Sequence, residues 1–157
     1  MIHESKNDFG GYFEDFVTGD VFKHWPGKTI TEMDNHLFSL LTMNHNPLHI
    51  DEHYMTKHQH KKILVVGTLV FSLIVGMSVK DISGKAIANL EYENIVHYKP
   101  VFQGDTLYAI STILDVVLSK TKTDRGIVYL ETIGENQNKD KVISLRRRFL
   151  VPKKHVE

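Results

Sequence analysis

The segment of residues 44–51 concentrates side chains that could perform chemistry. It reads NHNPLHID, so two asparagines, two histidines and an aspartate surround one proline. Imidazole is the side chain whose ordinary pKa lies near neutrality, which makes His49 a candidate general base. The amide of Asn44 can orient a water molecule but cannot take a proton from it. The segment therefore offers a candidate base for proton transfer.

Pro47 determines where this segment can lie. Its ring removes a backbone N–H and clashes with the preceding turn, so a helix cannot continue through it. The proline also displaces Asn46 from the helical region. We therefore expect a tight excursion that holds His49 on an ordered loop and is fixed by the Asn46 amide. Asp51 is expected to cap the short helix that follows, over residues 51–58.

Two helices should position this segment. The first is predicted from Thr31 to about Met43, with Thr31 as its cap and acidic residues in its first turn. Its expected apolar face consists of Met33, Leu37, Phe38, Leu40 and Leu41. The second run, Val65 to Val79, is apolar on nearly all sides and predicts a helix buried by a sheet, although its β-branched residues also permit a strand. Gly67 lies at its start, where a backbone N–H at the positive helix end could hold a negative oxygen.

The second half of the chain changes to the alternating pattern of strands. Four runs, at residues 86–98, 106–117, 126–134 and 142–151, are separated by turn residues. The first thirty residues, rich in aromatics and glycine, predict a packed lead-in with short extended pieces. This order indicates an α+β fold, with an antiparallel sheet wrapped around a central apolar helix and a single domain over residues 1–157. Arg146, Arg147 and Arg148 alternate along the last strand, so Arg147 is expected to face differently from its neighbours and the three cannot form one patch. We expect a solvated rim, although one or two of them could meet the phosphates of a nucleotide-bearing ligand.

Composition limits the classes of function. The 157 residues suit one domain, and 41% of them are hydrophobic. Lys plus Arg equals Asp plus Glu at 19 each, so no net field favours nucleic acid or an anionic membrane. The absence of cysteine excludes disulfides and thiolate metal sites. Residues 1–8 lack the apolar core of a signal peptide, and the apolar run is too short and mixed to span a membrane. We therefore expect a soluble, cytoplasmic protein.

A metal site is not expected. His45, His49 and His53 are spaced four apart, which on one helix would align them. Pro47 breaks that helix, and no further ligand pattern accompanies the three histidines.

Three motifs in this order carry a resemblance to a known family: NPLHID at 46–51, Gly67, and PVFQGDTL at 100–107. The chain resembles, from about residue 9 to residue 152, the MaoC-like hydratase/dehydratase family of the hotdog fold. The phrases LTMN at 41–44 and ANL at 88–90 are similar to its branch of mesaconyl-CoA and methylmalyl-CoA hydratases.

The resemblance implies a hotdog subunit with an overhanging helix segment, usually a homodimer or larger homo-oligomer with sheets continuous across the interface. It implies reversible addition of water to the double bond of a 2-enoyl thioester of coenzyme A, with no other cofactor. His49 and Asn44 would be the catalytic residues. Gly67 would hold the thioester oxygen, and Asn46 and Val66 would complete the substrate-binding backbone.

The sequence departs from the family pattern at two positions. Asn44 occupies the place of an aspartate, and Val75 stands about where a hydroxyl is expected on the central helix. His49 could then carry the proton transfers while Asn44 positions water, or Asp51 or Asp34 could supply an additional acid. Alternatively, the chain is a hotdog thioesterase or a non-catalytic acyl-CoA-binding protein. A thioesterase would need an acid on the central helix, and residues 67–79 contain none.

Overall fold

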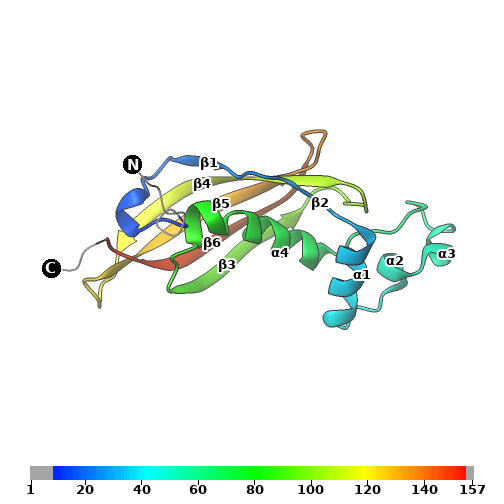
Figure 1. The fold of residues 1–157 in the computed structure, drawn as a ribbon, viewed down its shortest axis with the longest axis horizontal. Coiled ribbons are helices and arrows are strands. Elements are labelled where there is room, and N and C mark those ends of the chain that lie inside the picture. Colours follow the sequence, from blue (N-terminus) through cyan, green and yellow to red (C-terminus); the bar gives the residue numbers. More distant parts are fainter. Residues whose placement is uncertain (1–8, 155–157) are drawn as a thin grey trace, which may run out of the picture.

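The computed structural model describes residues 9–154 (Figure 1). Residues 1–8, where a signal peptide was not expected, and residues 155–157 lie outside the described residues. Six strands form an antiparallel sheet in the order β1-β4-β5-β6-β3, and β2 also pairs with β4. The strands are β1 (Val21–Lys23), β2 (Lys28–Thr29), β3 (Ala88–His97), β4 (Thr106–Leu118), β5 (Arg125–Glu135) and β6 (Lys141–Pro152).

The four long strands match the predicted runs to within two residues at each end, because their alternating pattern continues between clear turn residues. The predicted lead-in is confirmed as a single helical turn (Phe13–Asp15) followed by the short strands β1 and β2. One side of the long strands is buried: along β5, every second residue from Gly126 to Gly134 is buried. The sheet therefore has an inner face that requires a partner layer.

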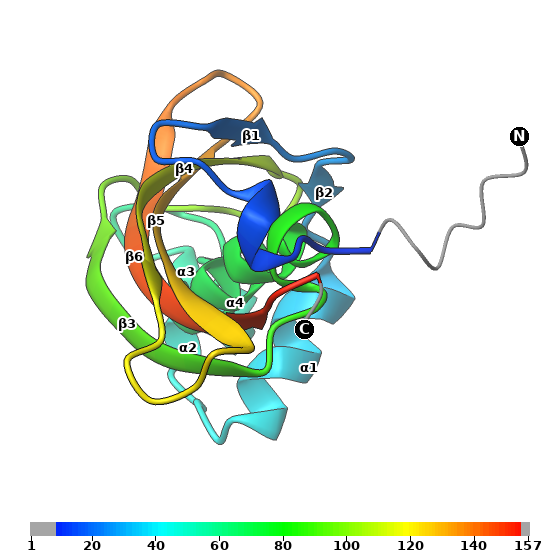
Figure 2. The same cartoon turned by 90° about the vertical axis from the view of Figure 1, so that its left-hand side faces the viewer.

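Helix α4 (Gly67–Met77) is that layer, and it lies in the concave face of the curled sheet (Figure 2). Val70 and Ile74 are buried against inner-face residues of the strands. The main members of this core are Ile30, Val65, Val70, Ile74, Val101, Leu107, Ala109, Val142, Ile143 and Leu145. The structure confirms the predicted hotdog arrangement. Helix α4 is apolar on most of its sides because the curled sheet wraps around it. Within residues 9–154, no helix has the length and hydrophobicity needed to cross a membrane.

Three helices extend past one end of the sheet, next to the beginning of α4 (Figure 1). They are α1 (Glu32–Leu41), α2 (Pro47–Ile50) and α3 (Glu52–Met55), and we call residues 32–55 the overhanging segment. The expected helix over residues 51–58 is shorter, ending at Met55. The apolar stripe of α1 is present at helical spacing but is exposed: Met33 and Leu41 retain 73% and 75% of their surface. The polar residues Asn35 and Ser39 are the fully buried ones instead.

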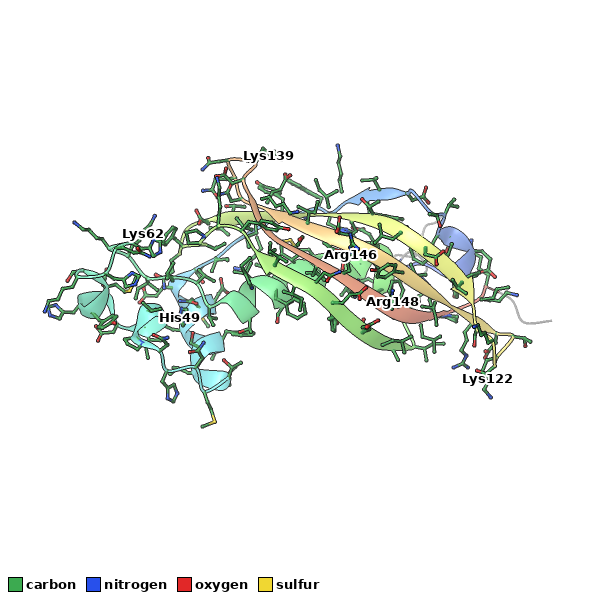
Figure 3. All side chains as sticks on the ribbon, turned by 180° about the vertical axis from the view of Figure 1, so that it is seen from behind. His49, Lys62, Lys122, Lys139, Arg146 and Arg148 are labelled. Atoms are coloured by element: carbon green, nitrogen blue, oxygen red, sulfur yellow. The ribbon has the colours of Figure 1, made fainter. Side chains whose placement is uncertain are left out.

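Arg147 faces the opposite way from Arg146 and Arg148, as the alternation predicts, and it therefore does not lie on a solvated rim. Its side chain is fully buried, and its Nη2 donates to the hydroxyls of Ser78 and Ser83 at 2.8 and 3.0 Å. Both serines lie at the end of α4 and in the π-helical turn η3 (Val79–Ser83), where a cation interacts favourably with the helix dipole. Burial lowers the pKa of the Arg147 guanidinium below its usual range. Arg146 and Arg148 lie on the outer face of β6 (Figure 3).

The first turn of α1 offers a test of its capping. Asp34 accepts hydrogen bonds from Lys28 Nζ at 2.7 Å and the Thr31 N–H at 2.8 Å, and these bonds, that of Lys28 first, lower the Asp34 pKa to about 2. We expect Asp34→Ala to reduce the free energy of unfolding at pH 7 by about 1 kcal/mol. Because the folded-state pKa is depressed, this contribution is complete above pH ~4 and is lost as the pH falls toward ~2.

Urea denaturation of both proteins at pH 7 and at pH 2.5 measures this difference. Glu32→Ala is the matched control, since Glu32 lies in the same turn and its side chain makes no capping contact. A stability difference that does not shrink at low pH would contradict the assignment of Asp34 as an ionised cap.

Candidate active site

His49 lies in α2, within the overhanging segment (Figure 3). The expected loop is therefore a single helical turn. Helix α1 already ends at Leu41, and Pro47, whose fixed φ suits the first position of a helix, begins a new one. The Asn46 Oδ1 accepts the Leu48 N–H at 3.1 Å and caps this turn, so the amide of Asn46 does fix the chain here. The result is a short rigid support for the imidazole.

One hydrogen bond determines which nitrogen of His49 can act as a base. Its Nδ1 lies 3.0 Å from the carbonyl oxygen of Leu64. A carbonyl only accepts, so Nδ1 carries the hydrogen and Nε2 keeps its lone pair in the neutral ring. Leu64 is itself held by its N–H, which donates to the Leu48 carbonyl at 3.0 Å. The ring is thus oriented with Nε2 free to accept a proton.

A pocket of about 290 Å³ joins His49 to the beginning of α4. The residues lining it are His49, Leu64, Val65, Gly67, Val70, His97, Tyr98, Lys99, Pro100 and Val101. Val66 is the N-cap of α4 and Gly67 its first residue. The Val66 N–H donates to the Asn35 side chain at 2.9 Å, whereas the Gly67 N–H has no acceptor within residues 9–154. Of these two predicted substrate-binding residues, Gly67 alone offers a free backbone donor to the pocket.

Asn44 does not line this pocket. Its Oδ1 accepts the Asn46 N–H at 3.3 Å. The residue before it, Met43, has a left-handed backbone with φ 58°. The amide NH₂ of Asn44 can still donate, so its role in holding water stays a prediction.

The two carboxylates considered as additional acids both serve as helix caps. Asp51 accepts the Tyr54 N–H at 2.8 Å at the start of α3. Asp34 is held by Lys28 and Thr31. Neither lines the pocket.

Asn35 is a residue of the site that pattern analysis does not reveal. Its side chain is fully buried and its Nδ2 donates to the carbonyls of His49 and Leu64 at 3.1 and 3.2 Å. Its Oδ1 accepts the Val66 N–H. One amide therefore links α1 to the backbone of the base, to the carbonyl that orients its ring, and to the N-cap of α4.

His97 was also missed, although it lies only three residues before the 100–107 motif. It ends β3 and reaches the pocket from the sheet. Within the described residues, no group of three or more His, Cys, Asp or Glu is placed to hold a metal ion.

Comparisons with known proteins place the chain in a family. A family model described as "MaoC like domain" matches residues 15–136. The chain is 31% identical over 149 residues to a mesaconyl-CoA hydratase of Cereibacter sphaeroides and 32% identical over 151 residues to a beta-methylmalyl-CoA dehydratase of Chloroflexus aurantiacus. The matches cover 95% and 96% of this chain but 43% and 42% of those relatives, so the chain spans less than half of their length.

A solved structure gives the same result for the fold. The crystal structure of a MaoC domain protein from Chloroflexus aurantiacus superposes with a TM-score of 0.89 at 31% identity, covering 94% of this chain and 42% of that one. The similarity to mesaconyl-CoA and methylmalyl-CoA enzymes that the sequence motifs indicated is thereby confirmed. The chain belongs to the MaoC-like domain family.

Proposed function

We propose that the protein catalyses the reversible addition of water to the double bond of a 2-enoyl-CoA thioester. The observation that supports this proposal is the pocket, which brings together the oriented imidazole of His49 and the Gly67 N–H that is unpaired within residues 9–154. Those two groups are what this reaction requires: a base for water, and a donor for the thioester oxygen as it gains negative charge.

In the proposed reaction, Nε2 of His49 takes a proton from water while the water oxygen attacks C3 of the enoyl group. The π electrons move toward the thioester oxygen, which the Gly67 N–H and the positive end of α4 stabilise. His49 then returns its proton to C2, so the product gains one water and the enzyme is unchanged. Asn44 is proposed to orient the water through its amide. The scheme uses no carboxylate and no metal, and coenzyme A enters only as part of the substrate.

A short acyl group is the proposed substrate. The two relatives act, by their names, on mesaconyl-CoA and methylmalyl-CoA. A pocket of about 290 Å³ lies at the lower end of the range for small-molecule sites and supports a short group.

The test is turnover of crotonyl-CoA and mesaconyl-CoA, followed by loss of ultraviolet enoyl-thioester absorbance and, in parallel, by release of free thiol. Hydration lowers the absorbance without releasing thiol. Thiol release would instead identify a thioesterase, a function disfavoured by the absence of any acid on α4. Binding of the esters without either signal would identify a non-catalytic acyl-CoA-binding protein.

The proposed assembly is a homodimer formed through β3. This strand is an edge of the sheet. Four of its apolar residues keep 39–50% of their surface exposed: Leu90, Tyr92, Ile95 and Val96. Exposed apolar edge strands are normally covered or paired. We expect light scattering to give twice the mass of one 18.1 kDa chain. We expect Ile95→Lys to shift the mass toward the monomer, while Val117→Lys, at an equally exposed position of β4, leaves it unchanged.

A further inference from the structure

The pocket contains a second imidazole, that of His97, which lies against Gly67, the first residue of α4. A Cβ built on Gly67 would lie 3.2 Å from both Cε1 and Nε2 of this ring. That separation is tighter than ordinary van der Waals contact, so the missing side chain of Gly67 is what lets the ring approach the backbone there. The nearest ring edge carries Nε2, a nitrogen that can donate a hydrogen bond.

His97 has none of the contacts of a structural histidine. Within residues 9–154, neither of its ring nitrogens has a hydrogen-bond partner, and the residue is exposed in the pocket that His49 lines. His24 shows the contrast: it is buried, and its two nitrogens are bonded to Asp81 at 2.7 Å and Ser111 at 2.8 Å. Both nitrogens of His97 therefore remain available to a ligand.

A second donor beside the Gly67 N–H would stabilise the thioester oxygen further. A developing oxyanion is usually stabilised by two or more donors. The Val66 N–H, next to that of Gly67, is already bonded to Asn35. Apart from the two chain neighbours of Gly67, the side chain nearest to its built Cβ is that of His97, which supplies all three of the closest atoms.

We propose that His97 is a catalytic residue that donates a ring N–H to the thioester oxygen bound at the Gly67 N–H. This inference rests on the proposed hydratase function and adds a second oxyanion donor to it. The ring keeps its proton throughout, so the step is a strengthened hydrogen bond and transfers no atom. In a site where Asn44 replaces the expected aspartate and Val75 the expected hydroxyl, His97 supplies a polar group from the sheet.

The variants His97→Ala and His97→Gln test this role with crotonyl-CoA and mesaconyl-CoA. Removing one oxyanion donor is expected to lower kcat by about 10²–10³-fold with little change in KM. His97→Gln, whose amide can still donate, is expected to recover most of the loss. His36→Ala, an imidazole of α1 outside the pocket, is the matched control and should retain wild-type turnover. The melting temperature should not move in either His97 variant, because the side chain bonds to nothing in the described chain.

The two substrates separate the oxyanion role from recognition of the acyl group. The acyl group of crotonyl-CoA has no free carboxylate, whereas that of mesaconyl-CoA carries one at the end far from the thioester. Equal losses of kcat on both support the proposal. A loss confined to mesaconyl-CoA would overturn it, because His97 would then bind that carboxylate, and unchanged kcat in His97→Ala would overturn it as well. Failure of the wild-type protein to hydrate either ester would overturn the hydratase function itself.

A double-mutant cycle with Gly67→Ala adds a geometric test. The added methyl would displace the His97 ring while keeping the Gly67 N–H in place. Gly67→Ala should therefore cost much less in the His97→Ala background than in the wild type. Fully additive losses would show that the two residues act independently, against the proposal.

Discussion

Replacing His49 with alanine is expected to lower kcat for enoyl-CoA hydration by about 10²–10⁴-fold, the usual contribution of general acid–base catalysis. Nε2 of this ring is the proposed acceptor of the water proton, and neither Asp51 nor Asp34 lines the pocket to replace it. The fold should persist, because the side chain makes one hydrogen bond and its partner, the Leu64 carbonyl, keeps the Asn35 Nδ2 as a donor. A normal melting temperature with lost turnover is the expected result.

Two further variants show whether the loss comes from the base. His49→Gln can keep a donor near the Leu64 carbonyl but provides no base, so it should be as inactive as the alanine variant. His53→Ala removes an exposed imidazole from the neighbouring helix α3 and should retain full activity. Turnover of His49→Ala within threefold of wild type would rule out the proposed mechanism.

The sequence predicts the sheet well, and it locates the segment that carries His49, because both patterns are encoded locally. Alternation between turn residues places the strand over 106–117, and the structure ends it one residue later, at Leu118. No helix continues through Pro47, as predicted, but α1 already ends at Leu41, and Pro47 begins the turn that carries His49 because its φ suits a first helical position. His49 and Gly67 could be predicted because each lies in a short motif with a mechanism of its own.

Asn35 and His97 could not be predicted, because each reaches the site through packing between distant segments. Periodicity locates the apolar stripe of α1 but does not say what lies against it. In the described chain that stripe is exposed, and the opposite, polar side of the helix packs against the turn that carries His49. His97 reaches the pocket because β3, paired with β6, brings its last residue to the first residue of α4. For Arg147 the alternation predicts the face of the strand but not the hydrogen-bond partners, because Ser78 and Ser83 are far away in sequence.

Replacing Asn35 with leucine is expected to affect both stability and turnover. The change keeps a similar side-chain volume but leaves the His49 carbonyl and the Val66 N–H without their Asn35 partner in a buried place. Each buried group left unpaired costs about 1–3 kcal/mol, so the loss of both partners should lower the free energy of unfolding by roughly 2–6 kcal/mol. The Leu64 carbonyl is spared, because His49 Nδ1 still donates to it.

Ser39→Ala is the control that isolates the hydrogen bonds of Asn35. Ser39 is equally buried on the same helix, and its hydroxyl has no partner within the described residues, so its removal should cost little or even stabilise. Turnover, measured where Asn35→Leu is still folded, should fall at least tenfold, because the base and the oxyanion donor are no longer held to one another. A destabilised variant with unchanged kcat would show that Asn35 supports the fold alone. Reduced kcat in a folded protein would show that this one amide fixes the separation of His49 from Gly67.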